Sequence, residues 1–214
     1  MAREPHRPAS PDGYHHGDLR RALIDSAVAI VTKEQNWAFS LREVARVAGV
    51  SHNAPYNHFV DKRDLLAAVA AAGIEALRAK MLDAISDRDR ADKALAKVGV
   101  VYVKFGLENP GHFRLMFSSE LNDETGARPA IAVNAGLKTR ELLESIIRRG
   151  VRTGVFSNAY SQNEQLQAAV LTAWSAVHGL TMLAINGMPA VPRKFLDQIA
   201  DKLTTIVCQG LMRH

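Results

Sequence analysis

The sequence predicts an all-α protein of about nine helices. Apolar residues recur every three or four positions through most of the chain, which is the period of an amphipathic helix. Clusters of glycine, proline and asparagine separate these periodic stretches. The one strand-like run, 98–105, has apolar residues at i, i+4 and i+7 and therefore fits a buried helix better.

The composition is that of a soluble globular protein. Of 214 residues, 47% are hydrophobic and 23% are charged, which is enough to bury a core in one or two domains. The single cysteine, Cys208, excludes an intrachain disulfide and a zinc site built from several thiolates. The first ten residues contain no apolar segment, which excludes a secretory signal, and no apolar run predicts a membrane span. We therefore expect a cytoplasmic protein without membrane contact.

The charge distribution is mildly biased toward the front of the chain. The formal net charge is +5, and residues 1–63 hold nine Lys and Arg residues against seven acids, with five of the eight histidines. This balance permits nucleic acid as a partner but does not establish it.

The N-terminal part divides into an arm and a first helix. Residues 1–17 are expected to form a flexible arm, because proline and glycine punctuate them without apolar periodicity. The helix is predicted to begin after Asp18, a suitable N-cap, and to end between residues 34 and 37. Its apolar positions are Leu19, Leu23, Ala27, Ile30 and Val31.

The second helix has clear start and stop signals. Ser40 and Glu43 form a capping box at its start, and Gly49 can take the positive φ of a tight turn at its end. Its apolar face consists of Leu41, Val44, Ala45 and Ala48.

Ser51 is predicted to cap a short third helix over residues 51–59, and Asp61 to cap a long helix that runs to residue 85. The first three helices, with a tight turn between the second and the third, make a helix-turn-helix domain that the long helix joins to a C-terminal bundle. The third helix carries hydrogen-bonding side chains and no carboxylate, which suits a phosphate-lined groove: His52, Asn53, Tyr56, Asn57 and His58.

The mixed-charge segment 87–92 predicts the boundary between two domains, 18–86 and 91–214. In the second domain, apolar periods predict helices over 95–105, 113–121, 131–150, 162–186 and 194–212.

Residues 14–77 resemble the DNA-binding domain of TetR-type transcriptional regulators. The resemblance rests on the order and spacing of Tyr14-His15-His16-Gly17-Asp18-Leu19-Arg20, Ser40-Leu41-Arg42-Glu43-Val44-Ala45, Gly49-Val50-Ser51, Tyr56-Asn57-His58-Phe59 and Asp61-Lys62. It implies that the third helix enters the major groove of an operator. By position, His52 and Asn53 would read bases. The phosphate contacts would be Ser40, Tyr56, His58 and Lys62, and the remaining DNA-binding candidates are Arg42, Ser51 and Asn57. Pro55 departs from the commonest pattern and is expected to tighten the first turn of this helix.

Residues 173–180 resemble the tryptophan-histidine-glycine (WHG) signature of one class of TetR-type C-terminal domains, and 102–105 with 109–117 resemble its upstream segment. This resemblance implies a small apolar or amphipathic effector and a homodimer through the last two helices. The candidate effector-binding residues are Tyr102, Phe105, Phe113, Met116, Trp174, His178 and Met182. The apolar residues expected at the dimer interface are Val170, Trp174, Val177, Leu196, Ile199, Leu203 and Ile206.

Some of these residues have a structural interpretation that the sequence favours. Phe59 fits a core residue better than a DNA contact. His178 fits a bundle residue bonded to a carbonyl, with Gly179 allowing close helix approach, better than an effector ligand. Arg3 and Arg7 fit a solvated tail better than a contact in the minor groove.

No motif predicts an enzyme, a cofactor or a metal site. The adjacent His15 and His16 lack a third ligand at suitable spacing, and the chain has no nucleophile elbow or glycine-rich phosphate loop. We therefore predict a sequence-specific DNA-binding transcriptional regulator, a ligand-responsive repressor that binds a palindromic operator as a homodimer. The alternative is a helical-bundle enzyme or adaptor whose helix-turn-helix-like front does not read DNA.

Overall fold

The computed structural model describes residues 16–187 and 195–212. They form eight α-helices and three short 3-10 helices: α1 (His16–Glu34), α2 (Leu41–Val47), η1 (Ala54–Asn57), α3 (Lys62–Asp83), α4 (Ala91–Glu108), α5 (Pro110–Met116), η2 (Ser119–Leu121), α6 (Ala130–Arg152), η3 (Asn158–Ser161), α7 (Asn163–Ile185) and α8 (Leu196–Leu211). Within these ranges there is no strand, only an isolated bridge between Phe156 and Met212. The all-α prediction is confirmed, and Arg3, Arg7 and His15 lie outside the described residues.

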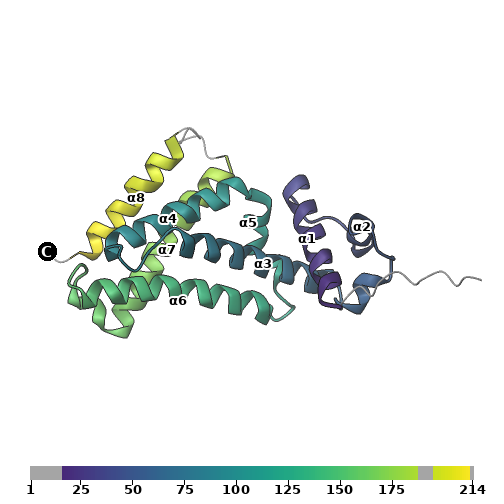
Figure 1. Ribbon diagram of the computed structural model, residues 1–214, viewed down its shortest axis with the longest axis horizontal. Helices are drawn as coiled ribbons and strands as arrows, with labels where there is room; N and C mark the ends of the chain where they lie inside the picture. The colour runs from purple at the N-terminus through teal and green to yellow at the C-terminus, as the bar shows by residue number, and fades with distance from the viewer. Residues whose placement is uncertain (1–15, 188–194, 213–214) are drawn as a thin grey trace, which may run out of the picture.

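The molecule is elongated, with a small head at one end and a helical bundle at the other. We define the head as α1, α2, η1 and the start of α3, and the bundle as the rest of the described chain. Figure 1 shows α3 running from the head into the bundle, where it packs between α4 and α6. Two hydrophobic clusters result, one in each part, and α3 contributes its first half to one and its second half to the other.

The head follows the predicted signals closely. Ser40 Oγ accepts the N–H of Glu43 at 3.2 Å and caps α2, and an Asp61 carboxylate oxygen accepts the N–H of Asp64 at 2.8 Å and caps α3. Gly49 has a φ of +69°. Glycine adopts this left-handed conformation readily, and the predicted tight turn after α2 requires it.

Two predicted boundaries in the head are wrong. The first helix begins at His16, so the residue expected to cap it, Asp18, lies inside its first turn. The third helix is not an α-helix over 51–59 but the 3-10 helix η1, with Asn53 as its N-cap. Pro55 has no N–H to donate, so the segment is held by i to i+3 bonds such as Tyr56 N–H to Asn53 O at 3.2 Å.

A buried junction joins the head to the bundle through α5. His112 Nε2 lies 2.7 Å from the carbonyl oxygen of Val69, and the apolar side chains of Leu115 and Leu121 belong to the head cluster. Gly111 lies so close to α1 that a Cβ there would be 2.7 Å from the carbonyl oxygen of Val31. The position of the head is therefore coupled to that of α5, which the sequence alone does not indicate.

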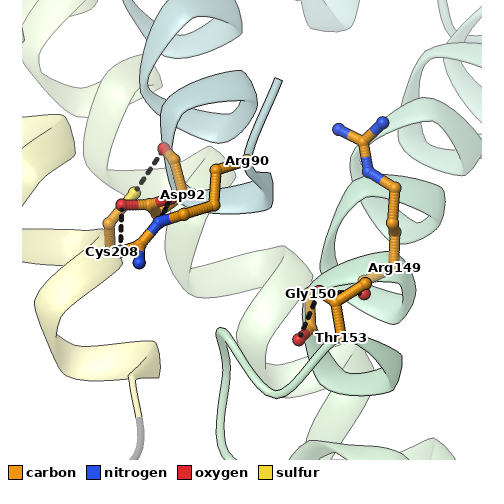
Figure 2. A network of polar contacts seen from close by, with 6 residues as sticks. All are labelled: Arg90, Asp92, Arg149, Gly150, Thr153 and Cys208. Atoms are coloured by element: carbon orange, nitrogen blue, oxygen red, sulfur yellow. Dashed lines mark hydrogen bonds and ion pairs between the residues drawn. The ribbon is translucent and has the colours of Figure 1, made fainter. Parts of the chain in front are cut away.

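At the far end of the bundle, α4 and α8 are connected by polar contacts (Figure 2). Arg90 donates to both carboxylate oxygens of Asp92, at 2.7 and 2.9 Å, although the Asp92 side chain is only 8% exposed. The buried Cys208 thiol donates to the backbone carbonyl of Asp92 at 3.3 Å. Burial raises the pKa of Cys208 to about 11, so this cysteine is a protonated structural residue.

Asp92→Asn should make unfolding less sensitive to acid. The hydrogen bond from Arg90 holds the pKa of the Asp92 carboxyl below its usual value. The pair therefore stabilises the fold above the unfolded-state pKa of about 4, and this contribution is lost as the pH falls through the lower folded-state pKa. Urea midpoints measured from about pH 6 to pH 3 should fall more steeply for the parent than for the variant. Asp25→Asn, in an exposed pair on α1, should follow the parent, and parallel curves for parent and Asp92→Asn would contradict the prediction.

The helix α7 has the length and composition of a membrane span, so the expectation that no apolar run is long enough is wrong for this segment. One side of α7 is nevertheless buried in the bundle, through residues that include Leu166, Val170 and Val177. Core helices of soluble proteins pass the same length test, and α7 packs along both α4 and α8.

Candidate nucleic-acid interface and ligand pocket

The segment around η1 has exposed polar side chains on one side and buried apolar residues on the other. Ala54, Pro55 and Phe59 are buried in the head, which confirms the core interpretation of Phe59. The candidates that point outward are exposed: Ser40, Arg42, Ser51, His52, Asn53, Tyr56 and Asn57. Tyr56 is 53% exposed and is therefore not a core residue. The structure thus brings the predicted DNA-binding residues together on one end of the molecule.

Two cations near this face lie over aromatic rings of the head core. Lys62 Nζ lies 5.3 Å from the ring centroid of Phe39, and the Arg20 guanidinium carbon lies 5.0 Å from that of Phe59. Such contacts restrain long side chains while leaving their charge at the surface. Lys62, the first residue of α3, and His58, directly after η1, are both half-buried.

The sequence-based prediction missed three basic residues of the head. Arg20 was not singled out because its contact with Phe59 joins residues 39 positions apart in the sequence. Arg46 and Arg63 are exposed on α2 and α3, and only the basic balance of the N-terminal region hinted at them.

The bundle encloses a cavity of about 380 Å³, within the range of small-molecule sites. Every α-helix from α3 to α8 contributes to its wall. Most of the lining is aliphatic or aromatic, and the charged groups that reach it are the two arginines Arg128 and Arg140. The sequence-based prediction missed both arginines, because one lies in a loop and the other is one of several charged residues in the sequence of α6.

The predicted effector-binding residues divide into two groups. Tyr102, Met116 and Trp174 line the cavity. Phe105 and Phe113 are buried in the bundle core instead, Met182 packs against it, and His178 lies behind Tyr102. A helical apolar period does not distinguish a residue that faces a cavity from one that fills the core.

A fixed polar network lies in the cavity wall. The Tyr102 hydroxyl accepts the indole N–H of Trp174 at 3.0 Å and lies 2.9 Å from His178 Nδ1. Burial raises the pKa of Tyr102 and lowers that of His178, so the hydroxyl keeps its proton and donates it to a neutral imidazole. The partner of His178 is therefore this hydroxyl, not the predicted carbonyl. Gly179 faces open space, so it does not serve close helix approach within the chain.

The outer sides of α7 and α8 carry exposed apolar residues. Leu171 and Leu183 lie on α7, and Phe195 and Ile206 lie at the start and near the end of α8. Three residues expected at a dimer interface are instead buried within the chain: Val170, Val177 and Leu196. They face the bundle core because they occupy the opposite side of the same helices.

No group of three or more His, Cys, Asp or Glu residues that could hold a metal ion occurs among residues 16–187 and 195–212.

Two family models match the chain. The model for bacterial regulatory proteins of the tetR family matches residues 23–69, and that for the tetracyclin repressor-like C-terminal domain matches residues 95–206, more than half of the chain. The matches coincide with the head and the bundle.

Individual proteins are similar over nearly the whole length. An uncharacterized HTH-type transcriptional regulator, YobS of Bacillus subtilis, is 24% identical over 92% of this chain and 94% of its own. A protein of unknown function from Rhodococcus sp. RHA1 has 29% identity and a TM-score of 0.75, over 94% of this chain and 98% of that one. A regulatory protein of the tetR family from Rhodococcus RHA1 has 20% identity and a TM-score of 0.66, over 92% and 98% respectively.

Proposed function

The chain belongs to the TetR family of bacterial regulatory proteins, and from this premise we propose that it is a ligand-responsive repressor that binds a palindromic operator as a homodimer. Its identity as a transcriptional regulator and not an enzyme confirms the prediction from sequence. We place its action in the cytoplasm, where the DNA is.

The observation that most directly supports sequence-specific binding to an operator is the exposed polar face at η1. Three buried residues fix this short segment to the head core, while His52, Asn53 and Tyr56 remain open to solvent. In the proposed complex η1 enters the major groove, Asn53 reads a base edge, and Lys62 contacts a phosphate beside the groove. The division at residues 87–92 then separates the DNA reader from the effector domain, with α3 shared by both.

We propose that α7 and α8 pair with the same helices of a second copy. Leu171, Ser175, Gly179 and Leu183 are spaced by four residues and form one stripe on the outer side of α7. Gly179 has open space where a Cβ would be, so a partner helix could approach closely there. On α8, which packs against α7, Ile206 is also exposed and is the apolar residue that we assign to the same interface; a two-fold axis would then place two heads on successive half-sites.

Coupling between pocket and head is proposed to run through α5 as well as α3. Met116 lines the pocket, its carbonyl accepts a hydrogen bond from Arg128, and the other end of α5 meets α1 at Gly111. A ligand that binds better to one placement of α5 shifts the head toward that placement. Typical coupling of about 1–3 kcal/mol would change operator affinity about 5- to 150-fold.

Lys62→Ala should weaken binding to all DNA sequences alike. Removing one phosphate contact lowers the slope of log affinity against log salt by about one. Fluorescence anisotropy with the DNA flanking the gene, and with unrelated DNA, measures both quantities. Lys33→Ala, which removes an exposed lysine at the end of α1, is the matched control. If the parent binds the flanking and unrelated DNA equally well, the operator proposal fails and the adaptor alternative gains support.

Asn53→Ala should instead lose discrimination at one base position, at a cost of about 1–3 kcal/mol on the preferred operator. The variant and parent are compared on operators carrying each single base change. A uniform loss over all sequences would contradict base reading by Asn53.

A further inference from the structure

The cavity in the bundle has a mostly apolar lining, and the charged residues in its wall are both positive. No carboxylate reaches its wall in the described residues, whereas Arg128 and Arg140 do. A cationic ligand would therefore meet only like charge, and a purely apolar ligand would leave the arginines unused.

The two arginines differ in how they are engaged. Arg128 donates to the backbone carbonyls of Met116 and Ser118, so its guanidinium stabilises the C-terminal end of α5. Arg140 is half-buried on α6 and forms no hydrogen bond or ion pair with any residue that the structure describes. A guanidinium has five N–H donors, and none of those of Arg140 bonds an acceptor within the described residues.

The nearby acid, Glu144, interacts electrostatically with Arg140 but forms its hydrogen bonds with other residues. Glu144, one turn further along α6, accepts a hydrogen bond from Arg148 at 2.9 Å and another from Gln167 at 3.4 Å. Arg140 therefore remains available to an anion, and a planar guanidinium suits a carboxylate held by two parallel bonds.

The shape of the cavity indicates what is attached to the anion. Its lining on α6 runs from Ala132 to Leu143, a span of twelve residues, or about 16 Å of helix between the first and the last. Buried aliphatic groups of α3 and α4, among them Leu77, Leu95 and Val98, form part of its wall. The lining residues with partial exposure include Leu137 and Arg140, so a charged end at Arg140 keeps some contact with water.

We infer that the ligand of this pocket is an amphipathic anion, with its apolar part in the cavity and its charged end on Arg140. The inference rests on the proposed role of the pocket as the effector site. The anionic group binds the guanidinium, and the apolar chain displaces water from the aliphatic wall. This assignment gives Arg140, which donates no hydrogen bond to any residue that the structure describes, a specific function in ligand selection.

Calorimetric titration of the full chain with three ligands of equal chain length tests this inference: decanoate, 1-decanol and decyltrimethylammonium. We expect decanoate to bind about tenfold or more tightly than decanol, since hydrogen bonds to a charged group contribute that much, and the cation to bind least. Equal or better binding of decanol or of the cation, or no binding of decanoate, would overturn it.

Variants assign the preference to Arg140. Arg140→Gln should reduce decanoate affinity about tenfold or more and leave decanol affinity unchanged, while Arg140→Lys should retain part of the preference. Lys138→Gln removes an exposed lysine two residues away and should behave as the parent. Melting temperatures without ligand show whether each variant is folded. Unchanged decanoate affinity in folded Arg140→Gln would overturn the inference.

Operator release is measured separately. If decanoate binds through Arg140 but does not release DNA, the ligand class stands and the effector role fails. If the protein binds its operator but not decanoate, the regulator proposal stands and the ligand class fails.

Discussion

An Ile206→Arg variant should be a monomer and should bind its operator about 10²- to 10⁴-fold more weakly than the parent, the range by which linking two binding modules exceeds either one alone. Ile206 is 65% exposed in a single chain, and like Leu171 and Leu183 it is an exposed apolar side chain on one of the last two helices. In the proposed dimer it is buried against the partner helices, where an unpaired guanidinium would be costly.

The variant leaves the chain's own core intact, because the buried side of α8 consists of other residues, among them Ala200, Thr204 and Cys208. Thr205→Arg adds the same charge one position earlier, about 100° around the helix and away from the proposed interface. Light scattering should give a dimer mass for the parent and for Thr205→Arg, and a monomer mass for Ile206→Arg. A dimeric Ile206→Arg protein with parental operator affinity would refute this interface.

Local signals in the sequence predicted most of the helices because their causes are local. A capping side chain such as Ser40 or Asp61 bonds an amide three residues away, so the pattern and the contact lie within one turn. The 3-10 form of η1 was only partly predictable. Pro55 indicated a tightened turn, but the burial of Ala54 and Pro55 that holds it depends on the head core.

The pocket could not be predicted residue by residue. Tyr102 and Phe105 share one apolar helix, yet Tyr102 lines the cavity and Phe105 does not. Which of them faces empty space depends on how six helices leave a gap between them, and no periodicity encodes that. Likewise Arg140 is one of several charges in the sequence of α6, and only the fold shows that it lines the cavity without donating a hydrogen bond there.

Gly111→Ala should destabilise the protein by about 1–3 kcal/mol, the usual cost of overpacking, and weaken operator binding about fivefold or more. The new Cβ would lie 2.7 Å from the carbonyl oxygen of Val31 and 2.9 Å from the Cα of Gln35, both backbone atoms that no rotamer change can move. Either α5 or the end of α1 must shift. Since α1 packs in the same core as Phe59, which directly follows the η1 segment, we expect a shift there to change the placement of the exposed face at η1.

A matched control separates this close approach from the general effect of adding a methyl group. Gly136 lies within α6, and a Cβ there would meet no atom within 4 Å, so Gly136→Ala should be neutral or stabilise the helix by up to about 1 kcal/mol. Urea unfolding measures the stability of both variants, and anisotropy measures their operator affinity. If Gly111→Ala is destabilised but binds the operator as the parent does, the junction is structural only, and α3 alone must couple the pocket to the head. If both properties change together, α5 is part of the path by which a ligand in the bundle reaches the DNA-binding face.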